Sequence, residues 1–395
     1  MSNHKTPSIR FKGFTDDWEQ RKLGDVVSVY DGVHQTPDYK DNGIMFLSVE
    51  NIATLRSEKY ISEEAFKRDY KIYPQKGDIL MTRIGDVGTP NVVETSEKVA
   101  FYVSLALLKP SCIDSYFLCN AIQSPLFQKG LKDRTLVTAI PQKINKDEIG
   151  KVDLILPVST EEQTAIGEYF KNLDHLITLH QRKYEKLVNV KKSMLDKMFP
   201  KNGKKVPEIR FKGFTDDWEQ RKLGDVATFI NGRAYSQPEL LSSGKYKVLR
   251  VGNFYTNDSW YYSDLELGEK YYADYGDLLY TWSATFGPHI WLGDRVIYHY
   301  HIWKIDLSNQ LEKQFAVQLL EQDKANILSS KNGSTMVHIT KEGMEQKDVI
   351  IPPSTKEQQE IGAFFQQLDN LITLHQRELE KLQNLKKSLL NSMFI

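Results

Sequence analysis

Two stretches of the chain carry apolar residues at alternating spacings of four and three positions. One stretch begins at Ile166 and the other at Ile361, and in each of them eight of ten such positions are apolar. The first set is Ile166, Phe170, Leu173, Ile177, His180, Tyr184, Leu187, Lys191, Met194 and Met198. The second set is Ile361, Phe365, Leu368, Ile372, His375, Leu379, Leu382, Lys386, Leu389 and Met393. This spacing predicts two long helices, each with a coiled-coil seam along one side.

Each seam is preceded by a signal for the start of a helix. Ser159 and Thr160 are followed three positions later by Glu162 and Gln163, the pattern of a capping box, and residues 354–358 repeat it. The proline and glycine of PKNGKK end the first helix. About 39 residues at 1.5 Å each give a rod of roughly 58 Å. Because a whole domain separates the two helices, we expect them to pack against each other antiparallel.

Polar residues interrupt the two seams at matching places. These are His180 with His375 and Lys191 with Lys386. A polar residue at a seam position sets the register of a coiled coil, which is the interpretation we favour over a metal or catalytic role for the histidines. The basic run at 181–192 is first a solvated face, and second a contact for DNA phosphates or for a protein partner.

The chain is a tandem duplication. Residues 9–26 and 209–226 are identical, and residues 157–199 align without a gap to 352–394 with 27 identities in 43 positions. Between these constant blocks lie two variable segments that still share a scaffold. FLSVENI at 46–52 corresponds to VLRVGNF at 248–254, and GDILMTR at 77–83 to GDLLYTW at 276–282. Each reads as a turn leading into a buried strand.

These patterns predict an α+β protein with two pseudo-symmetric mixed α/β domains, separated by two long antiparallel helices that form a coiled coil. Each domain should contain one helix, near residues 114–130 in the first and 311–329 in the second. The predicted boundaries are 1–157 for the first domain, 158–200 for the first long helix and linker, 201–352 for the second domain and 353–395 for the second long helix.

Composition narrows the functional classes. The 395 residues include 52 basic and 52 acidic side chains, so the formal charge is zero, which argues against a purely electrostatic nucleic-acid binder. Two cysteines cannot build a disulfide framework or a four-cysteine zinc site. No apolar run approaches a membrane span and the N-terminus lacks a signal-peptide core, so we expect a cytoplasmic protein.

Catalytic and cofactor motifs are missing from the sequence. It contains no phosphate-binding G-K-[ST] loop, no H-E-x-x-H, no C-x-x-C, no G-x-S-x-G and no G-x-G-x-x-G. The HYH run at 299–301 would place two imidazoles on one face of a strand, but a third metal ligand is not evident. What remains is one scaffold carried twice with different loops, which suits a molecule that reads two features of duplex DNA at a fixed separation.

The order of these parts resembles the specificity subunits of type I restriction–modification systems. WEQRKLGDV opens each half, GDIL or GDLL lies in each variable segment, and P-x-S-T-x-E-Q opens each long helix. The resemblance covers essentially the whole chain. It implies a non-catalytic subunit with two target-recognition domains that reads a bipartite, asymmetric DNA site.

The resemblance also implies partners. Two methyltransferase subunits, which use S-adenosylmethionine to methylate adenines, would dock on the long helices, and nuclease and translocase subunits would join them; this chain itself would hold no cofactor and no metal. The partner-binding helices are represented by Ile166, Phe170, Leu173, Ile177, Leu187, Ile361, Phe365, Leu368, Ile372 and Leu382. Partner subunits could supply much of the phosphate contact, which would make the zero net charge tolerable.

Polar loop residues are the candidates for reading bases, because amide, guanidinium and hydroxyl groups match base edges. In the first domain they are His34, Gln35, Thr36, Arg83, Arg134, Thr138 and Gln142. In the second domain they are Arg233, Tyr235, Ser236, Trp282, Ser283, Lys331, Asn332 and His338. For each of them the alternative is an ordinary solvated loop residue or a turn hydrogen bond.

Two alternatives to DNA recognition stay open at this point. The seams and the neutral charge also suit a coiled-coil adaptor that binds only proteins. A chain that is itself a nuclease or methyltransferase is the weaker alternative, because the motifs above are missing.

Overall fold

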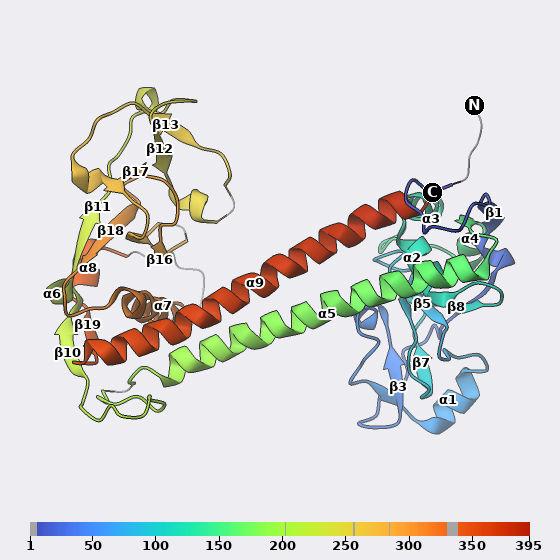
Figure 1. The fold of residues 1–395 in the computed structure, drawn as a ribbon. Helices are drawn as coiled ribbons and strands as arrows, with labels where there is room; N and C mark the ends of the chain where they lie inside the picture. Colours follow the sequence, from blue (N-terminus) through green and yellow to red (C-terminus); the bar gives the residue numbers. More distant parts are fainter. Residues whose placement is uncertain (1–5, 202, 256, 284, 330–338) are drawn as a thin grey trace. The chain divides into compact units, whose positions relative to one another are not determined.

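The computed structural model describes residues 6–201, 203–255, 257–283, 285–329 and 339–395 (Figure 1). The chain forms two compact units. Unit 1 comprises Met1–Arg182 together with Gln376–Ile395, and unit 2 comprises Lys183–His375. Each unit therefore contains one globular domain and a part of both long helices, α5 (Thr160–Lys197) and α9 (Thr355–Met393). The unit boundaries fall within the long helices, whereas the predicted domain boundaries fall at the helix ends.

Domain 1 is built on two sheets. The first is antiparallel, in the order β2 (Val27–Asp31), β8 (Leu105–Pro110), β5 (Ile79–Thr82) and β6 (Pro90–Val92). The second has the order β4 (Tyr60–Ile61), β3 (Ile44–Leu47) and β7 (Val99–Phe101), in which β3 and β7 are parallel. A two-stranded ladder of β1 (Glu19–Lys22) and β9 (Asp153–Leu156) joins the constant run to the strand before α5.

The remaining elements of domain 1 are short helices. They are η1 (Leu23–Asp25), η2 (Val49–Asn51), α1 (Glu63–Asp69), α2 (Ser115–Gln123), α3 (Pro125–Arg134) and α4 (Lys146–Gly150). The single helix predicted near 114–130 is wrong, because Ser124 ends α2 and caps α3. Pro125 has no N–H to donate and so occupies the first turn of a new helix.

Domain 2 repeats this plan. Its first sheet has the order β11 (Ala227–Asn231), β18 (Ile302–Leu307), β15 (Leu278–Thr281) and β16 (Gly287–Ile290). Its second sheet has the order β13 (Tyr261–Ser263), β12 (Tyr246–Leu249), β17 (Val296–Tyr298) and β14 (Tyr272–Ala273). The ladder is β10 (Glu219–Lys222) with β19 (Asp348–Ile351). Its helices are α6 (Leu223–Val226), η3 (Gln237–Glu239), η4 (Val251–Phe254), η5 (Glu269–Tyr271), α7 (Lys313–Ser329) and α8 (Lys341–Glu345). The predicted helix near 311–329 is present as α7.

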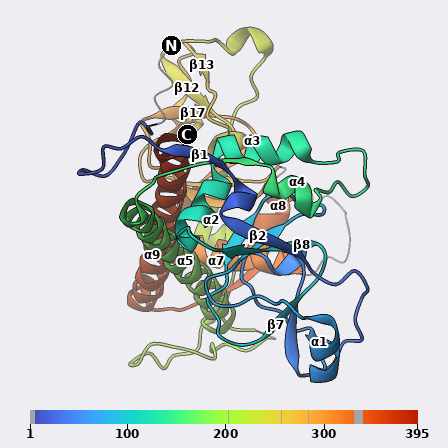
Figure 2. The same cartoon turned by 90° about the vertical axis from the view of Figure 1, so that its right-hand side faces the viewer.

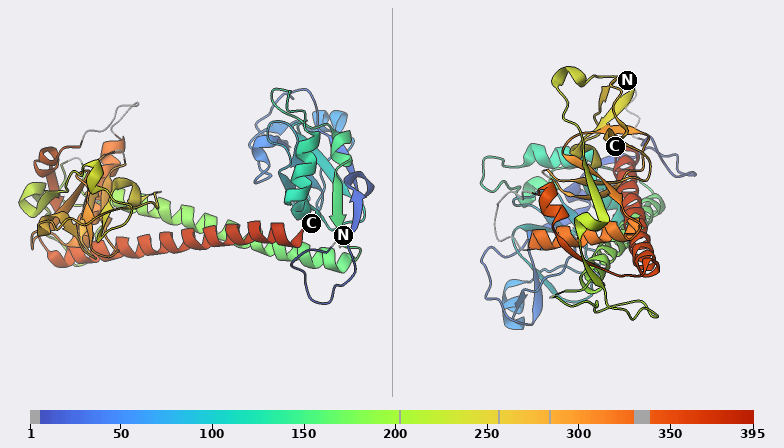
Figure 3. Two further views of the ribbon diagram at one scale, coloured as in Figure 1. Left: turned by 90° about the horizontal axis from the view of Figure 1, so that it is seen from above. Right: turned by 90° about the vertical axis from the view of Figure 1, so that its left-hand side faces the viewer.

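Within each unit, the two long-helix segments run side by side in opposite directions (Figures 1 and 3). All ten seam positions of each helix are buried or half-buried. In unit 1 the beginning of α5 packs with the end of α9, as Ile166, Phe170 and Leu173 share a core with Leu389 and Met393. The predicted antiparallel coiled-coil pairing is confirmed within each unit.

The seam lysines reach across to the opposite helix. Lys191 Nζ lies 2.6 Å from Asp369 Oδ1, and Lys386 Nζ lies 2.7 Å from Asp174 Oδ1. The two pairs occupy equivalent places in the duplication, one in each unit. His180 and His375 are half-buried at the seam. The lysine–aspartate pairs thus give the register a specific polar contact in each unit.

The start of each long helix differs from a standard capping box. Ser159 Oγ accepts a hydrogen bond from Glu162 N at 3.2 Å, as expected of an N-cap. The Glu162 carboxylate does not return to the cap, because it instead accepts from Arg10 Nε at 2.6 Å and Trp18 Nε1 at 3.3 Å. The capping-box prediction is therefore correct for the serine and wrong for the glutamate.

An equivalent aromatic cluster closes the core of each domain at the helix pair. In unit 1, Trp18, Phe117, Phe170 and Phe394 are in ring contact, with centroids 5.5 to 6.3 Å apart. In unit 2 the corresponding residues are Trp218, Phe315, Phe365 and Phe199. Each cluster thus combines two residues of a domain with one residue from each long helix or its end.

Close backbone contact explains a glycine in each long helix. A Cβ atom at Gly167 would lie 2.8 Å from Phe117 N, and one at Gly362 would lie 2.8 Å from Phe315 N. Both distances are shorter than real side chains tolerate, so the first turns of α2 and α7 can pack on the long helices only because these positions lack a side chain.

Candidate nucleic-acid interface and partner surface

Arg83 connects the three segments of domain 1 that carry the predicted base-reading residues. It follows β5, and its side chain is 6% exposed. Nε donates to the Ile144 carbonyl at 3.0 Å, and Nη1 forms an ion pair with Asp31. The guanidinium thereby holds the ends of the loops at 31–36, 83–88 and 134–144 together. The structure gives Arg83 a positioning role and leaves its guanidinium little surface for a base.

The loop after β2 in domain 1 and the equivalent loop after β11 in domain 2 both require glycine. A Cβ atom at Gly32 would lie 2.4 Å from the Phe101 carbonyl oxygen, and one at Gly232 would lie 2.3 Å from that of His299. The next residues, Val33 and Arg233, make backbone bridges to the opposing strand connection. Both loops therefore leave their sheets in the same way, and the residues that follow occupy equivalent places.

The remaining candidates of domain 1 lie on these loops. His34, Gln35, Thr36 and Thr138 are exposed. Gln142 is also exposed, and its Nε2 donates to Gly85 O at 3.0 Å, while Gly85 N donates to Gln142 O at 2.8 Å. Arg134 is half-buried, with Nη1 3.3 Å from Gly130 O. The structure brings all of these segments to one cluster of loops.

In domain 2 the equivalent loop carries an arginine that is held by a carboxylate. Arg233 Nη2 lies 2.6 Å from Glu239 Oε1, and its guanidinium lies 5.0 Å from the ring centroid of Tyr235. This hydrogen bond is the main cause that lowers the pKa of Glu239 to about 2, and the hydrogen bonds from Ser236 add to it. Ser236 is exposed and donates from N and Oγ to Glu239 Oε2 at 2.8 and 2.9 Å. Tyr235 is half-buried, and this burial raises its pKa.

Trp282 occupies the place in domain 2 that Arg83 has in domain 1. Its indole Nε1 donates to Tyr300 O at 2.9 Å, and its ring stacks on Trp303 with centroids 5.7 Å apart. Ser283 is half-buried beside it. The other candidates of this domain, Lys331, Asn332 and His338, lie outside the described residues.

The His299-Tyr300-His301 run is a turn between β17 and β18, so its assignment to a strand is wrong. The two imidazole centroids are 4.9 Å apart, and burial is the main cause that lowers the pKa of His299 to about 4. Burial also lowers the pKa of His301. Among the residues that the structure describes, no group of three or more His, Cys, Asp or Glu side chains could hold a metal ion.

Arg250 was not among the residues that the sequence pattern selected. It precedes η4, its guanidinium lies 4.2 Å from the ring centroid of Tyr261, and Nη2 donates to Ser259 O at 3.2 Å. Its positive charge also contributes to lowering the pKa of His299, which places it near the β17–β18 turn. The corresponding residue of domain 1 is Ser48, so alignment of VLRVGNF with FLSVENI could have selected this difference.

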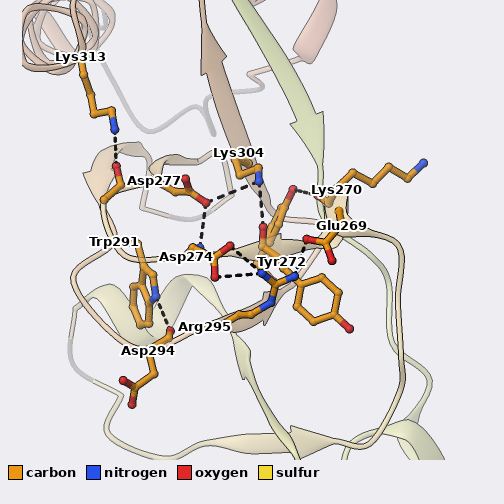
Figure 4. A network of polar contacts seen from close by, with 12 residues as sticks. Glu269, Lys270, Tyr272, Asp274, Asp277, Trp291, Asp294, Arg295, Lys304 and Lys313 are labelled. Carbon is orange, nitrogen blue, oxygen red and sulfur yellow. Dashed lines mark hydrogen bonds and ion pairs between the residues drawn. The ribbon is translucent and has the colours of Figure 1, made fainter.

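A polar network fixes the long connection before β15 (Figure 4). Arg295 pairs with Glu269 at 2.6 Å and with Asp274 at 3.0 Å, and it stacks over the Tyr272 ring at 4.2 Å. Lys304 donates to Tyr272 O at 3.1 Å. These residues satisfy one another, so the network stabilises the scaffold.

The apolar residues that the long helices expose are not the residues predicted to bind partners. The seam residues, from Ile166 to Leu187 and from Ile361 to Leu382, are buried or half-buried between the helices and the domain cores. Exposed apolar side chains on the helices include two matched pairs, Leu176 with Leu179 on α5 and Leu371 with Leu374 on α9, at 38% to 52% exposure; Tyr169, Val188 and Leu385 are also exposed. The two pairs are equivalent by duplication, so each unit offers the same pair of exposed leucines.

The profile of the family described as "Type I restriction modification DNA specificity domain" matches residues 15–189 and 215–384. The chain belongs to this family and contains its domain twice. It is 25% identical over 406 aligned residues to the putative type I restriction enzyme MjaX specificity subunit of Methanocaldococcus jannaschii, covering 95% of this chain and 92% of that protein. It is also 25% identical to the MjaVIII specificity subunit of the same organism, over 46% of this chain and 45% of that one.

Solved structures show the same fold. The type I restriction–modification S subunit of M. genitalium superposes with a TM-score of 0.70 at 14% identity, covering 99% of both chains. A chain from a structure of type I complex assembly and conformational transition has a TM-score of 0.51 at 14% identity, covering 94% of this chain and 96% of that one. In the described part of the chain, no helix combines the length and apolar character needed to span a bilayer.

Proposed function

We propose that this specificity subunit reads a bipartite, asymmetric DNA sequence, with domain 1 contacting one half and domain 2 the other. The observation that supports this most strongly is one scaffold with different side chains at equivalent loop positions. Gln35 and Thr36 correspond to Tyr235 and Ser236, and Arg83 corresponds to Trp282. Because base contacts depend on the identity of such side chains, the two halves of the site would differ in sequence.

Two methyltransferase subunits would bind the two equivalent helix surfaces. The matched leucine pairs, 176 with 179 and 371 with 374, support this because two identical partners need two equivalent sites. The chain would be non-catalytic, and the methyltransferases would supply S-adenosylmethionine and the transfer of the methyl group. Restriction and translocase subunits would complete the complex. The charged residues balance at 52 and 52, so the partners would carry much of the phosphate contact.

Domain exchange tests this proposal. Replacing residues 27–150 with the same segment of another specificity subunit should change one half of the methylated sequence and leave the other half and the spacing intact. The matched exchange of residues 227–345 should change only the other half. Sequencing of methylated adenines in cells that carry the complex gives the result, and a change in both halves after either exchange would refute the proposal.

A protein-only adaptor is the competing function. In a gel-shift assay, this function predicts that the purified complex with its methyltransferase slows the migration of all duplexes equally or of none. The DNA-reading function instead predicts DNA binding that depends on the sequence of the duplex and weakens with salt.

A further inference from the structure

The connection between α3 and α4 carries an apolar tip that the sequence pattern did not select. Leu136 is 44% exposed, Val137 66% and Ile140 99%. A single exposed apolar residue is ordinary on a protein surface, but three of them within five positions form a local patch. In Figure 2 this connection forms a loop at the edge of domain 1.

Hydrogen bonds fix the base of this loop. Leu136 N donates to Lys143 O at 2.7 Å, and Lys143 N donates back to Leu136 O at 3.4 Å. On one side, Thr135 Oγ1 donates to Leu131 O at 2.8 Å, which ties the loop to α3. On the other, Ile144 N donates to Arg83 O at 3.0 Å. The tip is therefore presented by an anchored hairpin that lies beside the candidate base-reading loops.

Basic residues flank the apolar tip along the sequence. Residues 129–146 contain five basic side chains and one acidic side chain, although the whole chain is neutral. The basic residues are Lys129, Lys132, Arg134, Lys143 and Lys146. Four of them are exposed and Arg134 is half-buried. Within the described part of the chain, none of the five forms an ion pair, although Arg134 lies near enough to Asp153 to lower its pKa, and the four exposed lysines present their charge to an anionic partner.

We propose that this hairpin enters a groove of duplex DNA, with Ile140 and Val137 against the bases of one half-site and the surrounding cations on the phosphates. The inference rests on the proposed function and adds an apolar contact to it. DNA fits both features, because cations bind its backbone while apolar side chains contact thymine methyl groups or unstacked base steps. An isolated apolar partner surface would leave the five cations without counter-charges.

The test uses the complex with its methyltransferase and a duplex that carries its methylation sequence. Ile140→Ser removes the apolar contact, and Ile72→Ser is the matched control, since Ile72 is a 42% exposed isoleucine of the same domain outside the hairpin. Lys132→Gln removes one cation. Affinity is measured over a series of salt concentrations and over duplexes with single base-pair changes in each half-site.

We expect Ile140→Ser to weaken binding roughly tenfold without changing the dependence of affinity on salt. It should also remove the discrimination at one or two adjacent base pairs of a single half-site, and Ile140→Val should restore most of it. Lys132→Gln should lower the salt slope by about one and leave base discrimination unchanged. Ile72→Ser should behave as the wild type.

The inference is overturned if Ile140→Ser retains wild-type affinity and discrimination while the wild-type complex discriminates normally. It is also overturned if the variant fails to assemble with the methyltransferase, because the tip is then a protein contact. A wild-type complex that discriminates no base pair at all contradicts the proposed function itself, so the two failures are distinct.

Discussion

Arg10 and Glu162 form a bidentate ion pair, with Nε 2.6 Å from Oε1 and Nη2 2.8 Å from Oε2. Glu162 is 1% exposed, and Arg210 with Glu357 repeats the pair at 2.7 and 2.9 Å. Each pair fastens the constant run to the first turn of a long helix. The helix therefore leaves its domain in a defined direction, since a buried fork contact fixes both groups.

Removing one member of this pair should strongly destabilise its unit. Arg10→Ala leaves a buried carboxylate without its cation, and we expect a loss of about 3 kcal/mol in the free energy of unfolding. Arg210→Ala should have a similar effect in unit 2. Urea denaturation followed by circular dichroism measures both changes. The control is Lys67→Ala, which removes the exposed ion pair of Lys67 with Glu63 in α1 and should change the free energy of unfolding by less than about 0.5 kcal/mol. Equal stability of all three variants would contradict the structural role of the pair.

The seam lysines should couple energetically to the aspartates of the opposite helix. Lys386→Glu places two like charges at the contact with Asp174, and adding Asp174→Lys restores an opposite pair. We expect a coupling free energy of about 1 kcal/mol from the double-mutant cycle in urea titrations. The matched cycle is Lys191 with Asp369, and additive effects in both cycles would show that the pairs do not interact.

Seam and surface leucines should have separable effects on partner binding. Leu176→Asp or Leu371→Asp alone should leave one methyltransferase bound, and the double variant none, with helix content unchanged. Leu187→Asp with Leu382→Asp should instead disrupt the helix pairing, because these side chains pack against the two domain cores. Native mass spectrometry gives the stoichiometry and circular dichroism the helix content. Retention of two methyltransferases by the first double variant would move the docking surface elsewhere.

Domain 2 should lose stability on mild acidification through His289. This imidazole stacks on Phe254 with ring centroids 4.1 Å apart, and burial lowers its pKa from 6.5 to about 4. Between these values the unfolded chain binds more protons than the folded one, so stability is full above pH 6.5 and falls as the pH drops toward 4. We expect a loss of about 1 kcal/mol between pH 7 and pH 5, allowing for solvent screening.

The control for this effect comes from the other domain. Asn91 lies opposite Leu80 as His289 lies opposite Leu279, so His289→Asn introduces the residue that the scaffold already holds there. The variant should lose part of the acid sensitivity in urea titrations at the two pH values, and the remainder stays with His299 and His301, whose pKa values burial also lowers. An unchanged pH dependence would assign the sensitivity to another group.

The long helices could be predicted from the sequence because a coiled-coil seam places apolar residues at regular spacings. Lys191 and Lys386 correctly marked the register of the two helices. The partner of Glu162 could not be predicted, since Arg10 lies 152 positions away and competes successfully with the local cap. The break between α2 and α3 had a visible signal in Ser124-Pro125, since proline favours the first turn of a helix.

The candidate site was harder to predict because exposure depends on tertiary contacts. Arg83 has the chemistry of a base reader, but Asp31 and the Ile144 carbonyl bury it. Ile140 has the chemistry of a core residue, yet the hairpin leaves it almost fully exposed. Residue type alone therefore selected the polar loop residues and passed over the apolar tip.

Phe199 and Phe394 have a consequence for how new specificities arise. Each phenylalanine comes from a constant block and completes an aromatic core together with a tryptophan of the other constant block and a single phenylalanine of the variable segment. A variable segment that keeps this one phenylalanine packs against the same three aromatic side chains of the constant blocks in either half of the chain. Exchange of a variable segment between the two halves would therefore leave its aromatic core intact.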